Sequence, residues 1–224
     1  MPRHSQILDS AAGPLPATVA ELRRALAAGQ RHFPGLHLLD VDGGELALAG
    51  CDLRGGSFQE SRFGHACFHG ANLAACGFQQ ALIWGADLSA VQAPQSSWQE
   101  ADLSGSRLQH ADLRRARLHR CCLRGVVAAG SRWCEATLVD VDFRSGQDQL
   151  TDLGGADFRG ADLSFAQLQG VQMRGADLRG CCLYGANFSG ADLRQADLRG
   201  CDLTACQLDG ADLQQAQLET AAGA

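Results

Sequence analysis

The sequence contains no lysine and a single tyrosine, and only 6% of its 224 residues are aromatic. All 19 basic residues are arginines, and 25 acidic residues outnumber them, so the formal net charge is -6. This balance excludes a generally basic nucleic-acid-binding protein, because phosphate backbones attract clustered positive charge. The small aromatic share and the 27 glycines argue against a conventional close-packed globule.

Long hydrophobic runs are also missing. No apolar run reaches the roughly 18 residues that a membrane-spanning helix needs, and we expect no membrane association. The first residues lack the apolar core of a secretory signal, which favours a cytoplasmic location. In that compartment the 10 cysteines are expected to be thiols and not a disulfide framework.

A period of five residues runs through most of the chain. From Leu48 onward, nearly every fifth residue is large and apolar, and the residue two places earlier is small. The unit reads Ala-Asp/Asn-Leu-x-Gly, as in Ala161-Asp162-Leu163. This period fits neither the 3.6 residues of a helical turn nor the alternation of a strand.

Each unit therefore places one large and one small side chain on the same side of an extended segment. A turn must follow in every unit, and the frequent glycine at its end suits that turn. The chain then winds around an axis with these side chains inward. One such coil cannot bury its core alone, so successive coils must stack.

This pattern resembles the pentapeptide repeat family. The resemblance covers residues 36–220 and implies an all-β fold, a right-handed quadrilateral β-helix with four units per coil and about nine coils. The narrow interior is expected to be filled by side chains, without room for a substrate. We therefore predict no enzyme activity and no catalytic, cofactor or metal site.

The two ends of the chain depart from the repeat. Thr18 and Glu21 have the spacing of a capping box, and apolar residues follow at helical spacing. They predict a short helix over 18–28 that covers the first coil, since an open end invites edge pairing. Residues 1–14 and 221–224 are expected to be tails. The last coil is either covered by its tail or used for association, which gives a monomer or a weak dimer.

Residues 145–151 interrupt the pattern. Asp148 stands where an apolar residue is expected, and burial of a lone carboxylate costs several kcal/mol. We therefore expect about one unit to leave the wall as a loop. Because an insertion of five residues preserves the period, the sequence also allows a distorted coil.

Two segments carry a closer resemblance. They are the unit around Ile83-Trp84-Gly85 and the interruption that ends in Thr151-Asp152-Leu153-Gly154. Both resemble, within this family, the regulators of heterocyst differentiation in filamentous cyanobacteria. That resemblance implies a regulatory interaction protein whose partner is another protein, such as a transcriptional regulator, with no direct nucleic-acid binding.

The candidate partner-binding residues are an outward tryptophan, a run of arginines and the interruption. They are Trp84, Arg114, Arg115, Arg117, Arg120, Arg124, Gln147, Asp148, Gln149 and Leu150. Each set also has an ordinary structural interpretation. The arginines fit a solvated band that wraps around the rod, and the tryptophan can pack against a neighbouring corner.

An alternative function is mimicry of DNA by the aspartates that recur in the units, as in family members that protect DNA gyrase from quinolones. The protein would then inhibit or protect gyrase or a related topoisomerase. The net charge of about -1 before residue 151 and -5 after it is weak for a duplex mimic. Asp157, Asp177 and Asp197 are also expected to stack beside arginines. Acceptance of hydrogen bonds from turn amides explains these aspartates more simply.

The cysteines and histidines offer further candidates. Cys181 and Cys201 are expected to stack one coil apart at the small inward position, where cysteine acts as a slightly larger alanine. The sequence leaves open whether such stacked thiols have a redox role. His65 and His69 have the spacing of helical metal ligands, but this segment is not expected to be helical.

Overall fold

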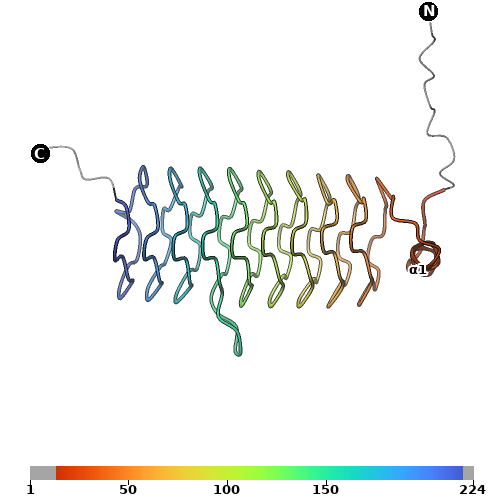
Figure 1. The fold of residues 1–224 in the computed structure, drawn as a ribbon, viewed down its shortest axis with the longest axis horizontal. Helices are drawn as coiled ribbons and strands as arrows, with labels where there is room; N and C mark the ends of the chain where they lie inside the picture. Colours follow the sequence, from red (N-terminus) through yellow and green to blue (C-terminus); the bar gives the residue numbers. More distant parts are fainter. Residues whose placement is uncertain (1–13, 219–224) are drawn as a thin grey trace, which may run out of the picture.

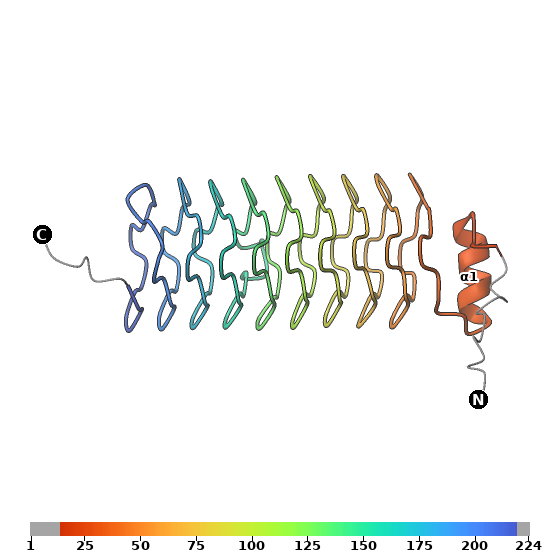
Figure 2. The same cartoon turned by 90° about the horizontal axis from the view of Figure 1, so that it is seen from above.

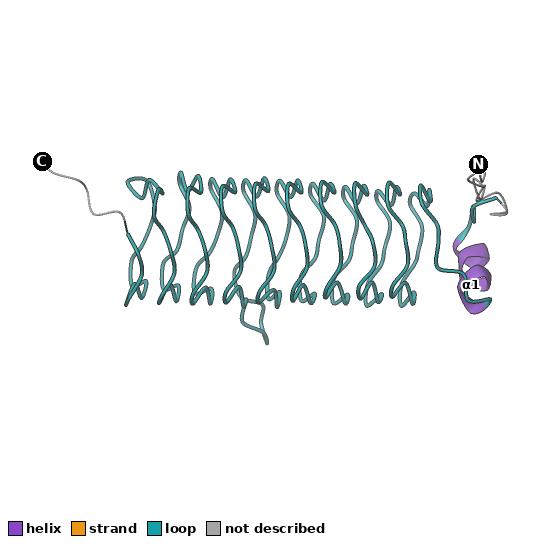
Figure 3. Ribbon diagram, turned by 45° about the horizontal axis from the view of Figure 1, so that its top comes forward, coloured by secondary structure: helices purple, strands orange, loops and turns teal. Residues whose placement is uncertain are grey.

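The structure is a computed structural model that describes residues 14–218. These residues form a straight rod of stacked coils with one helix, α1 (Val19–Ala27), at the N-terminal end (Figures 1 and 3). The expected N-terminal tail and the last residues of the chain lie almost entirely outside the described residues.

Helix α1 begins as the capping-box pattern predicts. The backbone N–H of Glu21 donates to the hydroxyl oxygen of Thr18 at 3.2 Å, and Leu22 is fully buried. The helix lies across the end of the rod (Figure 2), and Arg23 donates to the carbonyl of Gly44 at 3.2 Å. It thereby covers the core at the first coil.

The walls of the rod consist of single parallel β-bridges between residues 20 positions apart, such as Asp52 with Asn72. Within residues 14–218 no extended strand forms, because the chain turns after each bridge. The fifth residue of a unit takes a positive φ whether or not it is glycine, as at Phe165 (60°) and Gly160 (66°). The β-helix is therefore built from isolated bridges.

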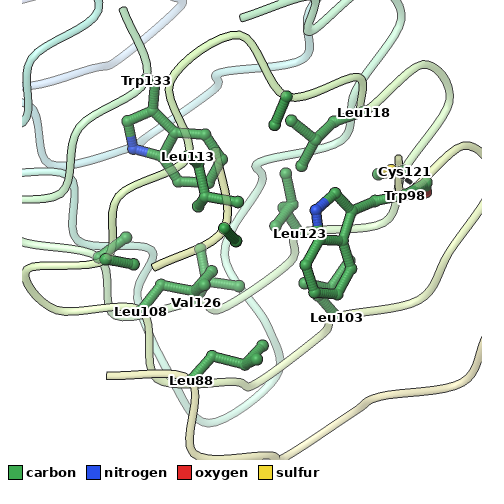
Figure 4. Close-up of a cluster of buried hydrophobic side chains, with 14 of the residues drawn as sticks. Leu88, Trp98, Leu103, Leu108, Leu113, Leu118, Cys121, Leu123, Val126 and Trp133 are labelled. Carbon is green, nitrogen blue, oxygen red and sulfur yellow. Dashed lines mark hydrogen bonds between the residues drawn. The ribbon is translucent and has the colours of Figure 1, made fainter. Parts of the chain in front are cut away.

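The interior is filled by the inward side chains (Figure 4). Trp98 and Trp133 are fully buried, and each follows a small residue, Ala93 or Ala128, one unit earlier. The indole N–H of Trp98 donates to Ser96 at 2.6 Å. Trp98 stacks on Phe78 and Trp133 on Phe158, with 4.3 and 5.8 Å between ring centroids, so the core remains filled where the repeat has alanine.

The interruption is a loop. Bridges change from a spacing of 20 to 25 residues at Val127 and Asp152, and return to 20 from Asp152 onward. The extra residues project from the rod (Figure 1). Thr151 was expected to belong to the loop, but it is fully buried in the wall. Its hydroxyl accepts from Gly125 N–H at 2.8 Å and donates to the Arg144 carbonyl at 3.1 Å.

The C-terminal coil is less well covered than the others. Leu198 is 1% exposed, whereas Leu203, Leu208 and Leu213 are only partly buried. Among the described residues no helix equivalent to α1 lies over this end. The rod therefore has one covered end and one partly open end.

Candidate protein-interaction surface

One wall of the rod, here called the loop wall, carries most of the departures from the repeat. Its bridge ladder joins Asp42, Arg62, Leu82, Asp102, Cys122 and Asp142 in order. Before the loop, the units of the wall are residues 41–45, 61–65, 81–85, 101–105, 121–125 and 141–145. Trp84 and Arg124 lie in units of this ladder, and the loop follows the unit of residues 141–145, after which the ladder continues through Gln167, Asn187 and Gln207. The bridge spacing of about 4.8 Å separates Trp84 from the base of the loop by roughly 14 Å.

Trp84 is half exposed, at 44%, and lies over a glycine of the preceding coil. A Cβ atom at Gly64 would be 2.8 Å from the indole ring. The ring of His65 meets the indole edge to face, with 4.5 Å between centroids. A surface hollow of about 310 Å³ lies beside the indole and is also lined by Asp42, Gly44, Glu45 and Arg62. Glycine at positions 44 and 64 therefore creates space next to the tryptophan.

The loop presents polar side chains around a tight turn. Gly146 N–H donates to the Gln149 carbonyl at 2.8 Å, which closes the turn around Gln147 and Asp148. Gln147, Asp148, Gln149 and Leu150 are all exposed, and 56% of the Leu150 surface is accessible. The base of the loop is anchored through Thr151, so the tip is held at a defined place on the rod.

The arginine band does not gather into one positive surface. Its members lie on three different bridge ladders, and four of the five contact a carboxylate. The pairs are Arg114 with Asp112, Arg115 with Glu135, Arg120 with Asp140 and Arg124 with Asp142. Arg117 has no acidic partner within residues 14–218. Of the five, only Arg124 lies on the loop wall, where its guanidinium is 3.8 Å from the carboxylate of Asp142.

A second wall, here called the ladder wall, pairs its charges along the C-terminal half of the rod. Arg159, Arg179 and Arg199 donate to Asp157, Asp177 and Asp197 of their own units at 2.6–2.7 Å. Arg159 and Arg179 also approach the aspartate of the next coil, at 3.6 and 3.5 Å. The hydrogen bond from Arg159 lowers the pKa of Asp157 to about 2. These carboxylates are neutralised within the protein.

Sequence reasoning singled out Trp84 and the loop but missed two features of the same wall. Gly44 and Gly64 were not singled out, although they occupy the fourth position of their units, as Trp84 and Arg124 do in theirs. Arg144, next to Arg124 on the ladder, was also missed. Both the glycines and Arg144 become apparent when the sequence is aligned with itself at an offset of 20 residues, the length of one coil before the loop.

Other kinds of site are not assembled. Among the described residues no three His, Cys, Asp or Glu side chains gather where they could hold a metal ion. Helix α1, at nine residues, is too short to cross a membrane, and residues 14–218 contain no longer one.

The sequence matches the family model described as pentapeptide repeats, in eight copies over residues 47–73, 85–120, 151–180 and 181–219. The chain belongs to the pentapeptide repeat family. Membership agrees with the stacked coils and implies that the β-helix is right-handed. The sequence matches none of the curated proteins.

Solved structures of several other proteins are similar to this one. HetL, a pentapeptide repeat protein involved in heterocyst differentiation regulation from the cyanobacterium Nostoc sp. strain PCC 7120, is 29% identical with a TM-score of 0.76. The match covers 93% of this chain and 99% of HetL. QnrB1 in a trypsin-treated form, a plasmid-mediated fluoroquinolone resistance protein, is 22% identical over 84% of this chain and 91% of its own, with a TM-score of 0.54. QnrB1 shares the fold only.

Proposed function

We propose that this protein is a non-enzymatic regulator that docks a protein partner on the loop wall. The observation that carries the proposal is the placement of Trp84, its hollow, Arg124 and the projecting loop on one bridge ladder. HetL, which covers nearly the same length, is described as involved in heterocyst differentiation regulation. A modulator of a regulatory protein is therefore the function that the similarity favours.

The chemistry of the loop wall suits a protein partner. Exposed tryptophan and leucine on an otherwise polar surface are typical contact residues, and Leu82 and Trp84 are 38% and 44% exposed. Arg124 and Arg144 share the carboxylate of Asp142, at 3.8 and 2.8 Å, so two positive charges face one negative charge near the loop, which favours an acidic region of the partner. A stacked rod loses little conformational entropy on docking, so the surface is preorganised.

Three coarser features belong to the same proposal. Four bridge ladders recur within each interval of 20 residues, which supports a four-sided cross-section and about nine coils. We also propose a cytoplasmic protein that acts as a monomer or as a weak dimer through its open C-terminal coil.

Affinity capture tests the proposed docking wall. Tagged wild-type protein and two variants, Trp84→Ala and a deletion of residues 146–150, are used to recover partners from extracts of the native cells. We expect a protein that binds the wild type and is lost with both variants. The matched control is Arg179→Gln on the ladder wall, which should retain that protein. Equal recovery with all four proteins would remove the loop wall as the docking site.

Mimicry of DNA against gyrase is less well supported by the structure, because the arginines pair with the stacked aspartates. A gyrase supercoiling assay, with and without a quinolone, distinguishes the two functions. We expect neither inhibition nor protection by the wild type. Inhibition that survives the loop deletion would favour the alternative.

A further inference from the structure

The C-terminal coil contains a gap in the otherwise continuous bridge pattern. Throughout residues 14–218, each large inward residue that has a coil after it donates its N–H to that coil, as Leu163 does to the Cys182 carbonyl at 2.8 Å. Leu183 is the exception, and Cys182 and Asp202 form no bridge. The other ladders of the last coil remain paired, as at Asp192 with Asp212. One unit, residues 201–205, therefore lacks the ladder hydrogen bonds to its neighbour, and we call this place the seam.

Two cysteines stack at the seam. Cys181 and Cys201 occupy the small inward position of consecutive coils, and each thiol donates to a backbone carbonyl at 2.9 Å, that of Phe158 and that of Leu178. No other two cysteines are consecutive at this position on one wall within the described residues. Elsewhere a cysteine stacks on a residue of another type, as Cys206 does on Ala186.

The two thiols also interact with each other. The neighbouring Cys201 thiol, and then burial, raise the pKa of Cys181, the more buried of the two. The coils remain in ordinary van der Waals contact just before them, because a Cβ atom at Gly200 would lie 3.5 Å from the Gly180 nitrogen. A Cβ atom at the corner glycines 155 or 175 would meet nothing within 4 Å.

We propose that Cys181 and Cys201 are an oxidisable dithiol that forms a disulfide across the seam, with a peroxide as the oxidant. A disulfide needs Cβ atoms about 3.5–4.5 Å apart, whereas a fully paired wall holds neighbouring chains about 4.8 Å apart. Without ladder hydrogen bonds, residues 201–205 are free to move closer. The stacked thiols therefore lie at the place where missing backbone hydrogen bonds allow the movement that a disulfide requires.

A small oxidant has access to the pair. Cys181 lines a surface cleft of about 110 Å³, together with Leu183, Tyr184 and Asp202, and Cys201 is only half buried. Cys201 is the expected nucleophile, since it is the more exposed thiol of the two and its thiolate is the reactive form. Cys181 is then the resolving thiol.

The reaction balances with one peroxide. The Cys201 thiolate attacks one oxygen of hydrogen peroxide, the O–O bond breaks, and a sulfenic acid and hydroxide form. The proton that left Cys201 converts this hydroxide to water. The Cys181 sulfur then attacks the Cys201 sulfur, the S–O bond breaks, and the hydroxyl leaves as a second water with the Cys181 proton. Two thiols are oxidised by two electrons, and the peroxide is reduced to two waters.

Peptide mapping of the full chain tests this site. Reduced, folded protein is treated with hydrogen peroxide, remaining thiols are alkylated, and the unfolded chain is digested with trypsin. Cleavage after Arg179, Arg194 and Arg199 places Cys181 and Cys201 in separate peptides. We expect a linked pair of these peptides, lighter by two hydrogens than their sum, with fragment ions that assign the bond and with reversal by dithiothreitol. Alkylation of both residues after peroxide treatment would overturn the proposal.

Serine variants keep the fold while they remove the chemistry. Serine already fills the same position at Ser61 and Ser106, where the hydroxyl donates to a carbonyl at 2.9 and 2.8 Å. Cys181→Ser and Cys201→Ser should lose the linked peptides. Cys206→Ser is the matched control, because Cys206 shares the coil and donates to the Leu183 carbonyl at 3.1 Å, and it should retain them.

A sulfenic-acid probe tests the order of the two steps. In Cys181→Ser the sulfenic acid cannot be resolved, so dimedone should label Cys201 after peroxide treatment. Labelling of Cys182 or Cys206 in place of Cys201, or linkage through those residues in the wild type, would show that the seam does not select its pair.

Discussion

The ladder wall and the loop wall are built from the same five-residue unit and differ in what their outward side chains do. On the ladder wall, the aspartate and arginine of each unit bind one another, and the pattern repeats along several coils. On the loop wall, successive units present glycine, tryptophan, serine and arginine at the same outward position, followed by a loop. The ladder wall repeats one ion pair from coil to coil, whereas the loop wall has such a pair within a unit only at Arg144 and Asp142 among its units before the loop and otherwise varies its outward residue.

This difference separates two kinds of constraint. Positions that repeat are required by the coil, so their residues carry little information about function. Positions that depart from the repeat without disrupting the coil are not constrained by folding, so their residues can reflect selection for function. If this distinction is correct, substitutions beneath a wall should affect stability, and substitutions on the loop wall should affect binding.

The largest expected effect is on stability and lies beneath the ladder wall. Phe158 is fully buried and stacks on Trp133 with 5.8 Å between ring centroids. Phe158→Ala should lower the free energy of unfolding by about 3–5 kcal/mol, because it removes apolar contacts and leaves a cavity. Urea unfolding followed by circular dichroism measures this loss. If Phe158→Ala lost less unfolding free energy than Trp84→Ala, a substitution at an exposed residue, the division between core and wall would be contradicted.

The next effect is on binding and lies on the loop wall. Trp84→Ala should weaken binding of the captured partner by about 2 kcal/mol, which is roughly a thirty-fold increase in Kd, if the indole is a central contact. Titration calorimetry with the purified partner measures the change. Tyr184→Ala is the control, because Tyr184 is 61% exposed on another wall and should leave Kd unchanged. An equal loss of affinity with both variants would indicate that binding is not confined to the loop wall.

Much of this architecture follows from the sequence because it depends on local, repeated choices. The pairing of large and small residues predicts the stacked coils, and the capping box predicts α1. Asp148 predicts the departure of the loop, since a carboxylate cannot be buried there.

The composition of each wall is harder to foresee. It depends on which units stack, and the inserted residues shift that register for everything that follows. The seam is not predictable from pattern alone, because the units of residues 181–185 and 201–205 read as ordinary repeats. The loss of their hydrogen bonds appears only in three dimensions.

A smaller effect concerns the ladder wall and acid. Arg159 lowers the pKa of Asp157 to about 2, so the carboxylate stabilises the fold above its unfolded pKa near 4, and this contribution is lost as the pH falls towards 2. Asp157→Asn should cost less than about 1 kcal/mol at pH 7, since the pair is near the surface. In urea titrations the difference from wild type should shrink as the pH falls from 4 to 2 and disappear below the folded pKa. A difference between the two proteins that stayed the same from pH 7 to pH 2 would contradict this assignment.

The smallest effect on stability should come from the deletion that most affects binding. Removal of residues 146–150 restores the spacing of 20 between bridges, so every later unit keeps its wall. Loop-closure entropy changes slowly with length, and we expect a midpoint of thermal unfolding close to that of the wild type. Deletion of residues 166–170, also five, is the matched control. It removes a unit from the wall and rotates all later units onto the neighbouring wall, which separates Asp177 from its stack on Asp157. If both deletions lowered the midpoint equally, the loop would be part of the scaffold, and the contrast between the two walls would no longer separate folding from function.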